Sequence, residues 1–235
     1  MPGTLYLVPN LLGNVAPSTV LPQRTIDAAR GLVHWVVETP KAARAFLNSL
    51  GMPVPIAQLD VVALPRAPGA DELAAVVATL ANGEDVGLVS DAGCPGVADP
   101  GSALVAAAHA AGLRVVPLVG PSAILLALMA AGLNGQHFCF HGYLPVKPEV
   151  RAEALRSLEA QSRSGARTEI FIETPYRNAA MLTALAKVLK PSTTVCIAAD
   201  LTLPTEHVER ASAREWSRRD VTRFERRPAI FLLQA

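Results

Sequence analysis

Residues 88–101, LVSDAGCPGVADPG, place three glycines, two prolines and two aspartates directly after an apolar strand end. Glycine leaves backbone N–H and C=O groups accessible, proline restricts the chain, and aspartate adds polar contacts. A loop that only joins two elements is usually shorter and less constrained. A second loop of this kind spans residues 119–123. We interpret the two loops as a ligand site built mainly from backbone groups, with Asp91, Asp99 or Ser122 supplying polar contacts.

Two common nucleotide-binding patterns are excluded. No two glycines lie two residues apart, so G-x-G-x-x-G is absent, and no Gly-Lys pair exists, so the phosphate-binding loop of nucleoside triphosphatases is absent. Cys94 lies far from the other two cysteines, Cys139 and Cys196, which we interpret as buried packing residues. No metal-ligand spacing relates the five histidines, His34, His109, His137, His141 and His207. We therefore expect neither a metal nor a disulfide framework.

Composition indicates a globular protein. The 235 residues are 51% hydrophobic, which is enough for one large core or two modest ones. The longest nearly pure apolar run, residues 123–133, is well short of the roughly 20 residues that cross a bilayer. The N-terminal segment MPGTLYLVPN lacks the basic region and cleavage site of a secretory signal. We expect a cytoplasmic protein with no membrane span.

The net charge of +1 excludes a general electrostatic attraction to nucleic acid. Residues 1–117 hold 6 basic and 9 acidic side chains, whereas residues 118–235 hold 15 and 11. A polyanion would therefore meet the second half more readily. Seven arginines lie between residues 210 and 227, but three acids separate them, so a solvated face with ion pairs is favoured over an RNA contact.

Strands and helices must alternate to position the two loops. Short apolar runs predict buried parallel strands at 3–9, 85–91 and 113–121. Helices are predicted at 22–30, 39–50, 70–82, 102–111 and 122–131, the fourth with Asp99 and Pro100 as its cap and first position. The second half predicts strands at 137–145, 166–174, 193–203 and 227–235, helices at 149–163 and 178–190, and a charged linker at 206–218. The pattern indicates an α/β protein with domains 1–119 and 120–235. Ligands of open parallel sheets bind beyond the carboxyl ends of strands, where both loops lie.

Six segments resemble the tetrapyrrole (corrin/porphyrin) methylase superfamily in type and order. They are residues 3–14, 88–101, 118–133, 141–145, 171–177 and 199–210. The amino-acid sequences of these segments are most similar to those of the branch that methylates a cytidine 2′-hydroxyl of small-subunit ribosomal RNA. The chain ends at its last predicted strand, without the helical extension of many relatives in that branch. The resemblance implies a class III methyltransferase fold, with two α/β domains, S-adenosylmethionine in the cleft between them, and a homodimer.

The resemblance also implies site residues. From the first half of the chain it assigns to the cofactor pocket Pro9, Asn10, Gly93, Cys94, Pro95, Val97, Gly120, Pro121, Ser122 and Ala123. From the second domain it adds Thr174, Ala199 and Asp200. A turn or capping role is the alternative for each single residue. For the two loops taken together, the pocket interpretation is favoured.

Methyl transfer to a hydroxyl requires in-line placement and a proton acceptor. Glu38, Asp91 and Tyr176 are the expected catalytic residues, as acceptor or orienting group, and Glu173 is a further candidate. Each could instead serve as a structural hydrogen-bonding partner. The side chains expected to bind an anionic part of the substrate, with surface ion pairing as the alternative, are Lys41 and Arg177.

Three positions depart from the motifs of that ribosomal RNA branch. Thr39 replaces an aspartate, Leu203 a lysine and Tyr176 a histidine. These changes preserve the cofactor motifs and leave the methyl acceptor open. The leading hypothesis is an S-adenosylmethionine-dependent methyltransferase acting on a ribose 2′-hydroxyl of small-subunit ribosomal RNA. The alternatives are a methyltransferase for a tetrapyrrole or another small molecule, and a cofactor-binding homologue that has lost catalysis.

Overall fold

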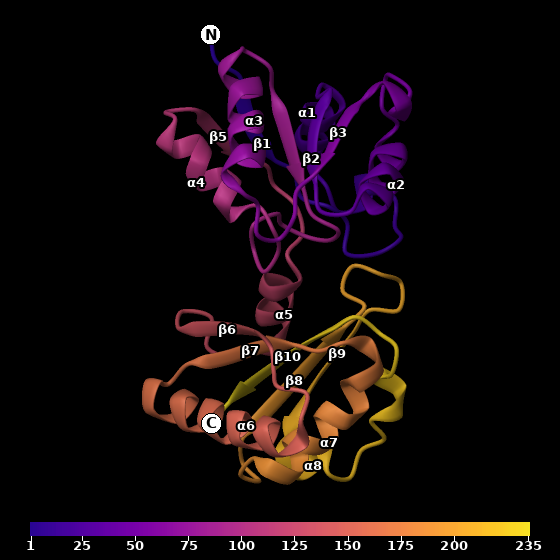
Figure 1. Ribbon diagram of the computed structural model, residues 1–235. Helices are drawn as coiled ribbons and strands as arrows, with labels where there is room; N and C mark the ends of the chain where they lie inside the picture. The colour runs from indigo at the N-terminus through magenta and orange to yellow at the C-terminus, as the bar shows by residue number, and fades with distance from the viewer. The chain divides into compact units, whose positions relative to one another are not determined.

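The computed structural model describes all residues from 1 to 235 and divides them into two units, Met1–Ser122 and Ala123–Ala235. Each unit contains a five-stranded sheet and its own buried core. Figure 1 labels the strands and helices of each unit.

The first unit has a fully parallel sheet in the order β3-β2-β4-β1-β5. Its strands are β1 (Thr4–Leu7), β2 (His34–Val37), β3 (Asp60–Ala63), β4 (Val86–Val89) and β5 (Arg114–Pro117). The three strands predicted in this half are confirmed as β1, β4 and β5. Because all five strands are parallel, their carboxyl ends lie along one edge of the sheet, and the loops that follow them are neighbours.

Four helices cover this sheet: α1 (Gln23–Arg30), α2 (Pro40–Leu50), α3 (Ala70–Ala81) and α4 (Ser102–Ala110). Trp35 and its neighbours pack with α1 and α2, whereas Leu5 and Val36 pack with α3 and α4. Burial of both sheet faces explains why the inner strands β1, β2 and β4 are mostly apolar, whereas the outer strands β3 and β5 are more exposed.

The cap and first helical position predicted for α4, Asp99 and Pro100, are wrong. The helix begins at Ser102, and its N-cap is Gly101, which has φ of +130° and no capping side chain. A Cβ at Gly101 would lie 2.7 Å from the Leu88 Cδ2 atom. Asp99 and Pro100 therefore belong to the loop, and the Asp99 carboxylate is not used as a cap.

The second unit has a mixed sheet in the order β6-β7-β10-β8-β9. Its strands are β6 (Phe138–Tyr143), β7 (Thr168–Ile172), β8 (Thr194–Ala199), β9 (His207–Ser212) and β10 (Ala229–Gln234). β6 runs parallel to β7, and every other pairing is antiparallel. Since β7 and β8 are both antiparallel to β10, their carboxyl ends lie at the same edge of this sheet.

The prediction of a charged linker at 206–218 is wrong over most of that range. The segment forms β9 and the short helix α8 (Ala213–Trp216). The Glu209 carboxylate on β9 pairs with Arg219 at 2.5 Å and with Arg223. The Ser212 side chain caps α8 in a capping box with Glu215. Pairing with arginines that follow later in the chain lets the Glu209 carboxylate occupy the outer strand of the sheet.

The remaining helices of this unit are α5 (Ala123–Ala131), α6 (Pro148–Gly165) and α7 (Asn178–Val188). Figure 1 shows α6 and α7 on one side of the sheet and α5 on the other. The core on the α6 and α7 side includes stacked Phe171 and Phe231 rings, with centroids 5.5 Å apart. No helix of either unit combines the length and apolar character needed to cross a membrane.

The three cysteines are unpaired. Cys196 on β8 is fully buried, as predicted. The prediction of a buried packing role is wrong for Cys139, which is only partly buried because it lies on β6, at the edge of the sheet.

Candidate functional site

Asn10 fixes the glycine-rich loop to the end of β1. Its backbone N–H donates to the Gly93 carbonyl at 2.8 Å, and the Gly93 N–H donates to the Asn10 carbonyl at 3.2 Å. The Asn10 side-chain Nδ2 also donates to the Ser90 and Asp91 carbonyls at 2.9 and 3.0 Å. Two of the predicted cofactor residues, Asn10 and Gly93, are thereby brought together.

The second loop approaches the same place through Gly120. A Cβ at Gly120 would lie 2.3 Å from the Pro9 Cβ, a separation that no packed pair of carbons tolerates. Only glycine at position 120 allows the chain after β5 to pass this close to the chain after β1. The structure therefore gives Pro9 and Gly120 a role in close backbone packing at the predicted pocket.

Cys94 links the two loops. Its Sγ donates to the Pro121 carbonyl, with a donor–acceptor distance of 3.5 Å. Burial raises the pKa of the Cys94 thiol, so the group stays protonated at neutral pH and can donate this bond. A hydroxyl at this position could donate the same bond.

Replacing Cys94 with threonine is therefore expected to be tolerated. The hydroxyl can retain the bond to Pro121, and the side-chain volume changes little. Affinity for S-adenosylmethionine, measured by calorimetry, should stay within a few-fold of the parent, which is a change below about 1.4 kcal/mol. A loss of affinity well beyond tenfold would contradict this role for Cys94.

The loop has the features that a folded adenosyl ligand would need. Gly93 has φ of +68°, and Pro95 beside it is buried. The Ser90 hydroxyl, at the base of the loop, is buried and has no hydrogen-bond partner. A buried hydroxyl without a hydrogen-bond partner lowers the stability of the folded chain. The Ser90 hydroxyl therefore fits a site in which a bound polar ligand supplies the missing hydrogen bond. Val97, in the same loop, leaves 51% of its surface exposed.

Two of the predicted catalytic acids, Glu38 and Asp91, take part in hydrogen bonds that join the chain after β2 to the chain after β4. The Asp91 carboxylate accepts hydrogen bonds from the Thr39 N–H at 3.1 Å and the Thr39 hydroxyl at 2.7 Å. The Glu38 carboxylate accepts from the Asp91 N–H at 3.1 Å. Both acids therefore hold the loop by hydrogen bonds, which is the structural role named as the alternative for them. Lys41, in the first turn of α2, is exposed and makes no ion pair.

Asp99 is an acid of this site that the sequence analysis placed only in a supporting role. Its carboxylate accepts no hydrogen bond, and burial, with Glu38 and Asp91 as like-charged neighbours, raises its pKa from 3.8 to about 6. Arg66 opposes that shift. Strand order brings the four residues together, because they follow β2, β3 and β4, which are adjacent in the sheet. An aspartate of this kind is ionised and weakly basic at neutral pH.

The predicted residues of the second unit gather at the ends of β7 and β8. The buried Glu173 carboxylate accepts from the Thr174 N–H at 2.7 Å and pairs with the Arg177 guanidinium. The other Glu173 oxygen is buried without a partner. Tyr176 leaves 79% of its surface exposed. Arg177 is thus held by an internal ion pair, whereas Tyr176 is free to contact another molecule.

Asp200 follows Ala199 at the end of β8 and has φ of +52°. Its Oδ2 accepts from Arg227 Nε and from the Thr205 hydroxyl, both at 2.8 Å. These bonds hold the turn after β8 in a fixed conformation. The structure thus brings the second-unit residues to one edge of their own sheet, as it does the first-unit residues.

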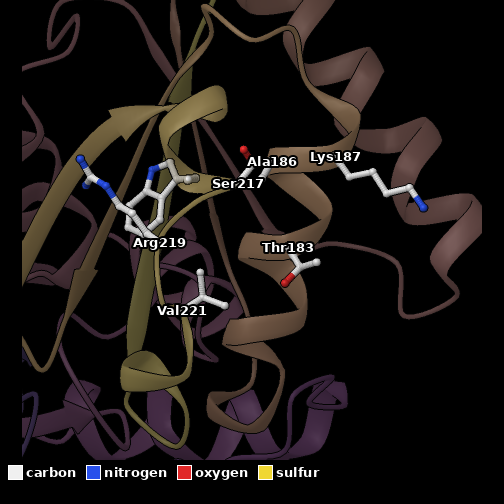
Figure 2. Close-up of a pocket in the computed structure, with 7 residues that line it drawn as sticks. Thr183, Ala186, Lys187, Ser217, Arg219 and Val221 are labelled. Carbon is white, nitrogen blue, oxygen red and sulfur yellow. The ribbon is translucent and has the colours of Figure 1, made fainter.

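A shallow pocket of about 370 Å³ lies elsewhere in the second unit (Figure 2). Its lining comes from α7 and from the chain at and after α8: Thr183, Ala186, Lys187, Trp216, Ser217, Arg219 and Val221. None of the residues predicted to bind cofactor or substrate lines it. The candidate residues therefore lie at the strand ends of each unit's own sheet and not in this pocket.

Comparison with known proteins relates the chain to methyltransferases. The family model for tetrapyrrole (corrin/porphyrin) methylases matches residues 4–216. The chain is 35% identical to a ribosomal RNA small subunit methyltransferase I of Escherichia coli O157:H7, over 94% of this chain and 74% of that protein. It is 37% identical to the protein of the same name from Xylella fastidiosa Temecula1, over 86% and 69% of the two chains.

A crystal structure of the methyltransferase CobJ is similar in fold. Its TM-score is 0.62 at 21% identity, and the match covers 98% of this chain and 92% of that one.

Proposed function

The chain belongs to the tetrapyrrole (corrin/porphyrin) methylases and is an S-adenosylmethionine-dependent methyltransferase, and from that premise we propose that it methylates a ribose 2′-hydroxyl of small-subunit ribosomal RNA in the cytoplasm. The observation that carries the choice of acceptor is the identity of 35% and 37% to two proteins named as small-subunit ribosomal RNA methyltransferases, each across most of this chain.

The residues we propose for cofactor binding belong, in the first unit, to its two loops and, in the second unit, to the ends of β7 and β8. Gly93 and Gly120 keep the loops free of side chains that would fill the site, and Asn10 fixes the loop after β4. Thr174, Ala199 and Asp200 would contribute from the second unit. When bound, S-adenosylmethionine supplies an electrophilic methyl group on a sulfonium.

This chain's own residues must place the acceptor hydroxyl and accept its proton. We assign the proton to Asp99, because its carboxylate is not engaged in hydrogen bonds and its raised pKa lies near the pH of the cytoplasm. Asp91 and Glu38 hold the loop that carries it. Lys41, Tyr176 and Arg177 are the residues we propose for contact with the RNA, the cation of Lys41 through phosphate.

A methyl-transfer assay tests this function. With labelled S-adenosylmethionine, the protein should methylate small-subunit ribosomal RNA, supplied as RNA or as assembled subunits, and leave tetrapyrrole precursors unlabelled. Digestion to nucleosides should locate the label on a ribose. Label on a tetrapyrrole alone would transfer the proposal to that acceptor, and cofactor binding without label on any substrate would favour the homologue without catalysis.

The homodimer that the resemblance implies is also part of this proposal. Met129 on the wholly apolar helix α5 leaves 79% of its surface exposed. A second copy of the chain would cover it. Sedimentation should report a dimer at micromolar concentration, and a monomer would contradict this part of the proposal.

A further inference from the structure

Three side chains with metal-binding chemistry converge on β6 and β7 of the second unit, and none of them is among the residues assigned to cofactor or substrate. Cys139 lies opposite Glu169 in the register of the two parallel strands, and His141 follows two residues later. One ligand atom from each residue, a sulfur, a ring nitrogen and a carboxylate oxygen, lies within 4.8 Å of the other two. The set spans two strands of one sheet, so backbone pairing fixes the positions from which the side chains start.

Glu169 anchors the cluster. Its side chain is fully buried, with Oε1 accepting from Arg167 Nε and Oε2 in contact with His141 Nε2, each at 2.6 Å. A carboxylate that is oriented by a hydrogen bond on one oxygen, with the other oxygen facing a histidine, resembles the supported ligands of protein metal sites. Arg167 therefore orients Glu169 through Oε1, whereas Oε2 is hydrogen-bonded to His141 Nε2, and a bound cation would replace that bond.

A break in the strand register accompanies the histidine. The pairing of β6 with β7 shifts between Phe140 and Tyr143, and Gly142 has φ of +66°. Bulges of this kind redirect side chains and are common beside functional sites. Here the bulge occurs where the His141 ring reaches Glu169 on the neighbouring strand.

The dimensions and the charge suit a tetrahedral divalent ion. Zinc bonds of about 2.0 to 2.3 Å place ligand atoms about 3.3 to 3.8 Å apart. The 2.6 Å contact between His141 and Glu169 must therefore open slightly, and the wider separations must close by no more than about 1.5 Å. A thiolate and a carboxylate, offset by the Arg167 guanidinium, leave one negative charge facing the cation.

We propose that Cys139, His141 and Glu169 form a Zn²⁺ site with water as the fourth ligand. The ligand set selects the ion, because thiolate and imidazole favour Zn²⁺, whereas Mg²⁺ and Ca²⁺ prefer oxygen ligands alone. On binding, the Cys139 thiol releases its proton to solvent, and His141 keeps its proton on the ring nitrogen that does not face Glu169. The ion joins the edge strand β6 to β7 and has no part in methyl transfer.

Cobalt substitution tests the site in the full chain. After reduction and removal of metals with a chelator, titration with Co²⁺ should give one ion per chain, with a thiolate-to-cobalt charge-transfer absorption that Zn²⁺ abolishes. Cys139→Ser should remove that absorption and weaken Zn²⁺ binding by about 100-fold or more, and His141→Asn should weaken binding comparably. The matched controls Cys196→Ala, on β8 of the same sheet, and His137→Asn, just before β6, should leave both measurements unchanged.

A second measurement needs no variant. Zn²⁺ should protect Cys139 from alkylation in the unmodified protein, with the labelled cysteine located by mass spectrometry, whereas labelling of Cys94 should not change. Three outcomes would overturn the proposal: no charge-transfer absorption, an absorption that persists in folded Cys139→Ser, or equal alkylation of Cys139 with and without Zn²⁺. Binding at surface histidines such as His34, which lies beside Asp60, would give Co²⁺ uptake without that absorption and would also overturn it.

Discussion

Gly93→Val is expected to abolish S-adenosylmethionine binding, with an affinity loss of at least about 100-fold, or about 2.7 kcal/mol, while the first unit remains folded. Gly93 has φ of +68°, a conformation that a β-branched residue disfavours. Its Cβ would lie 3.4 Å from the Leu12 side chain and 3.7 Å from the Pro121 carbonyl, and the two further methyl groups have less room. The loop must move, and the bridge between Asn10 and Gly93 is lost.

Gly112→Val is the matched control. Gly112 has the same φ of +68°, but a Cβ there meets no atom within 4 Å. The residue lies just before β5, at the amino ends of the parallel strands, whereas Gly93 follows the carboxyl end of β4. Both substitutions carry the backbone cost of about 1 to 2 kcal/mol for a left-handed residue, so both should lower the melting temperature. Calorimetry on the folded fraction should show lost affinity for Gly93→Val alone.

A different pairing of results would contradict the ligand role of the loop. If Gly93→Val lowered the melting temperature as Gly112→Val does but kept full affinity per folded molecule, the glycine-rich loop would be only a connection between β4 and α4. The bonds between Asn10 and Gly93 would then serve packing alone.

Local sequence patterns predicted much of this fold because the relevant signals are short in range. β4 and β5 are brief apolar runs that end in turn residues, and α7 ends after a continuous helical pattern. β9 escaped prediction because it carries the charged residues Glu209 and Arg210. The Glu209 carboxylate is neutralised by Arg219 and Arg223, which lie ten and fourteen residues further along the chain. Pairing of that kind appears only after the chain has folded.

The same distinction applies to the sites. Glycine and proline identified the loop around Gly93 because these residues report backbone conformation directly. The raised pKa of Asp99 depends instead on its burial and on Glu38, which becomes its neighbour only because β2 and β4 are adjacent in the sheet, as well as on Asp91 in the same loop. The cluster of Cys139, His141 and Glu169 depends in the same way on the register of β6 and β7. The short spacing of Cys139 and His141 in one strand was the one local signal of it.

Asp99→Asn is expected to reduce kcat for RNA methylation by about 100-fold or more, the usual effect of removing a proton acceptor. In the parent protein kcat/KM should rise with pH through about 6, because Asp99 accepts a proton only when ionised and its pKa is raised to about 6. The variant should lack this limb, since asparagine does not titrate. Asp71→Asn, in the first turn of α3, is the control and should leave the profile unchanged.

The same substitution should stabilise the protein at neutral pH, which separates a catalytic role from a structural one. The pKa of Asp99 is 3.8 in the unfolded chain and is raised to about 6 in the folded chain. Folding therefore favours the protonated acid. The stability this contributes is complete below pH 3.8, declines as pH rises, and is gone above about 6, where ionised Asp99 faces Glu38 and Asp91.

Asparagine mimics the protonated acid, so Asp99→Asn should unfold at a higher temperature than the parent above pH 6 and at the same temperature below pH 4. The shift from 3.8 to about 6 sets a ceiling of about 3 kcal/mol. Solvent screening of this half-buried side chain reduces the expected gain to about 1 kcal/mol, or about 2 to 4 °C. A variant that is more stable and almost inactive is the combined signature of a base held among like charges. A variant that keeps its activity, whatever its stability, would exclude Asp99 as the proton acceptor.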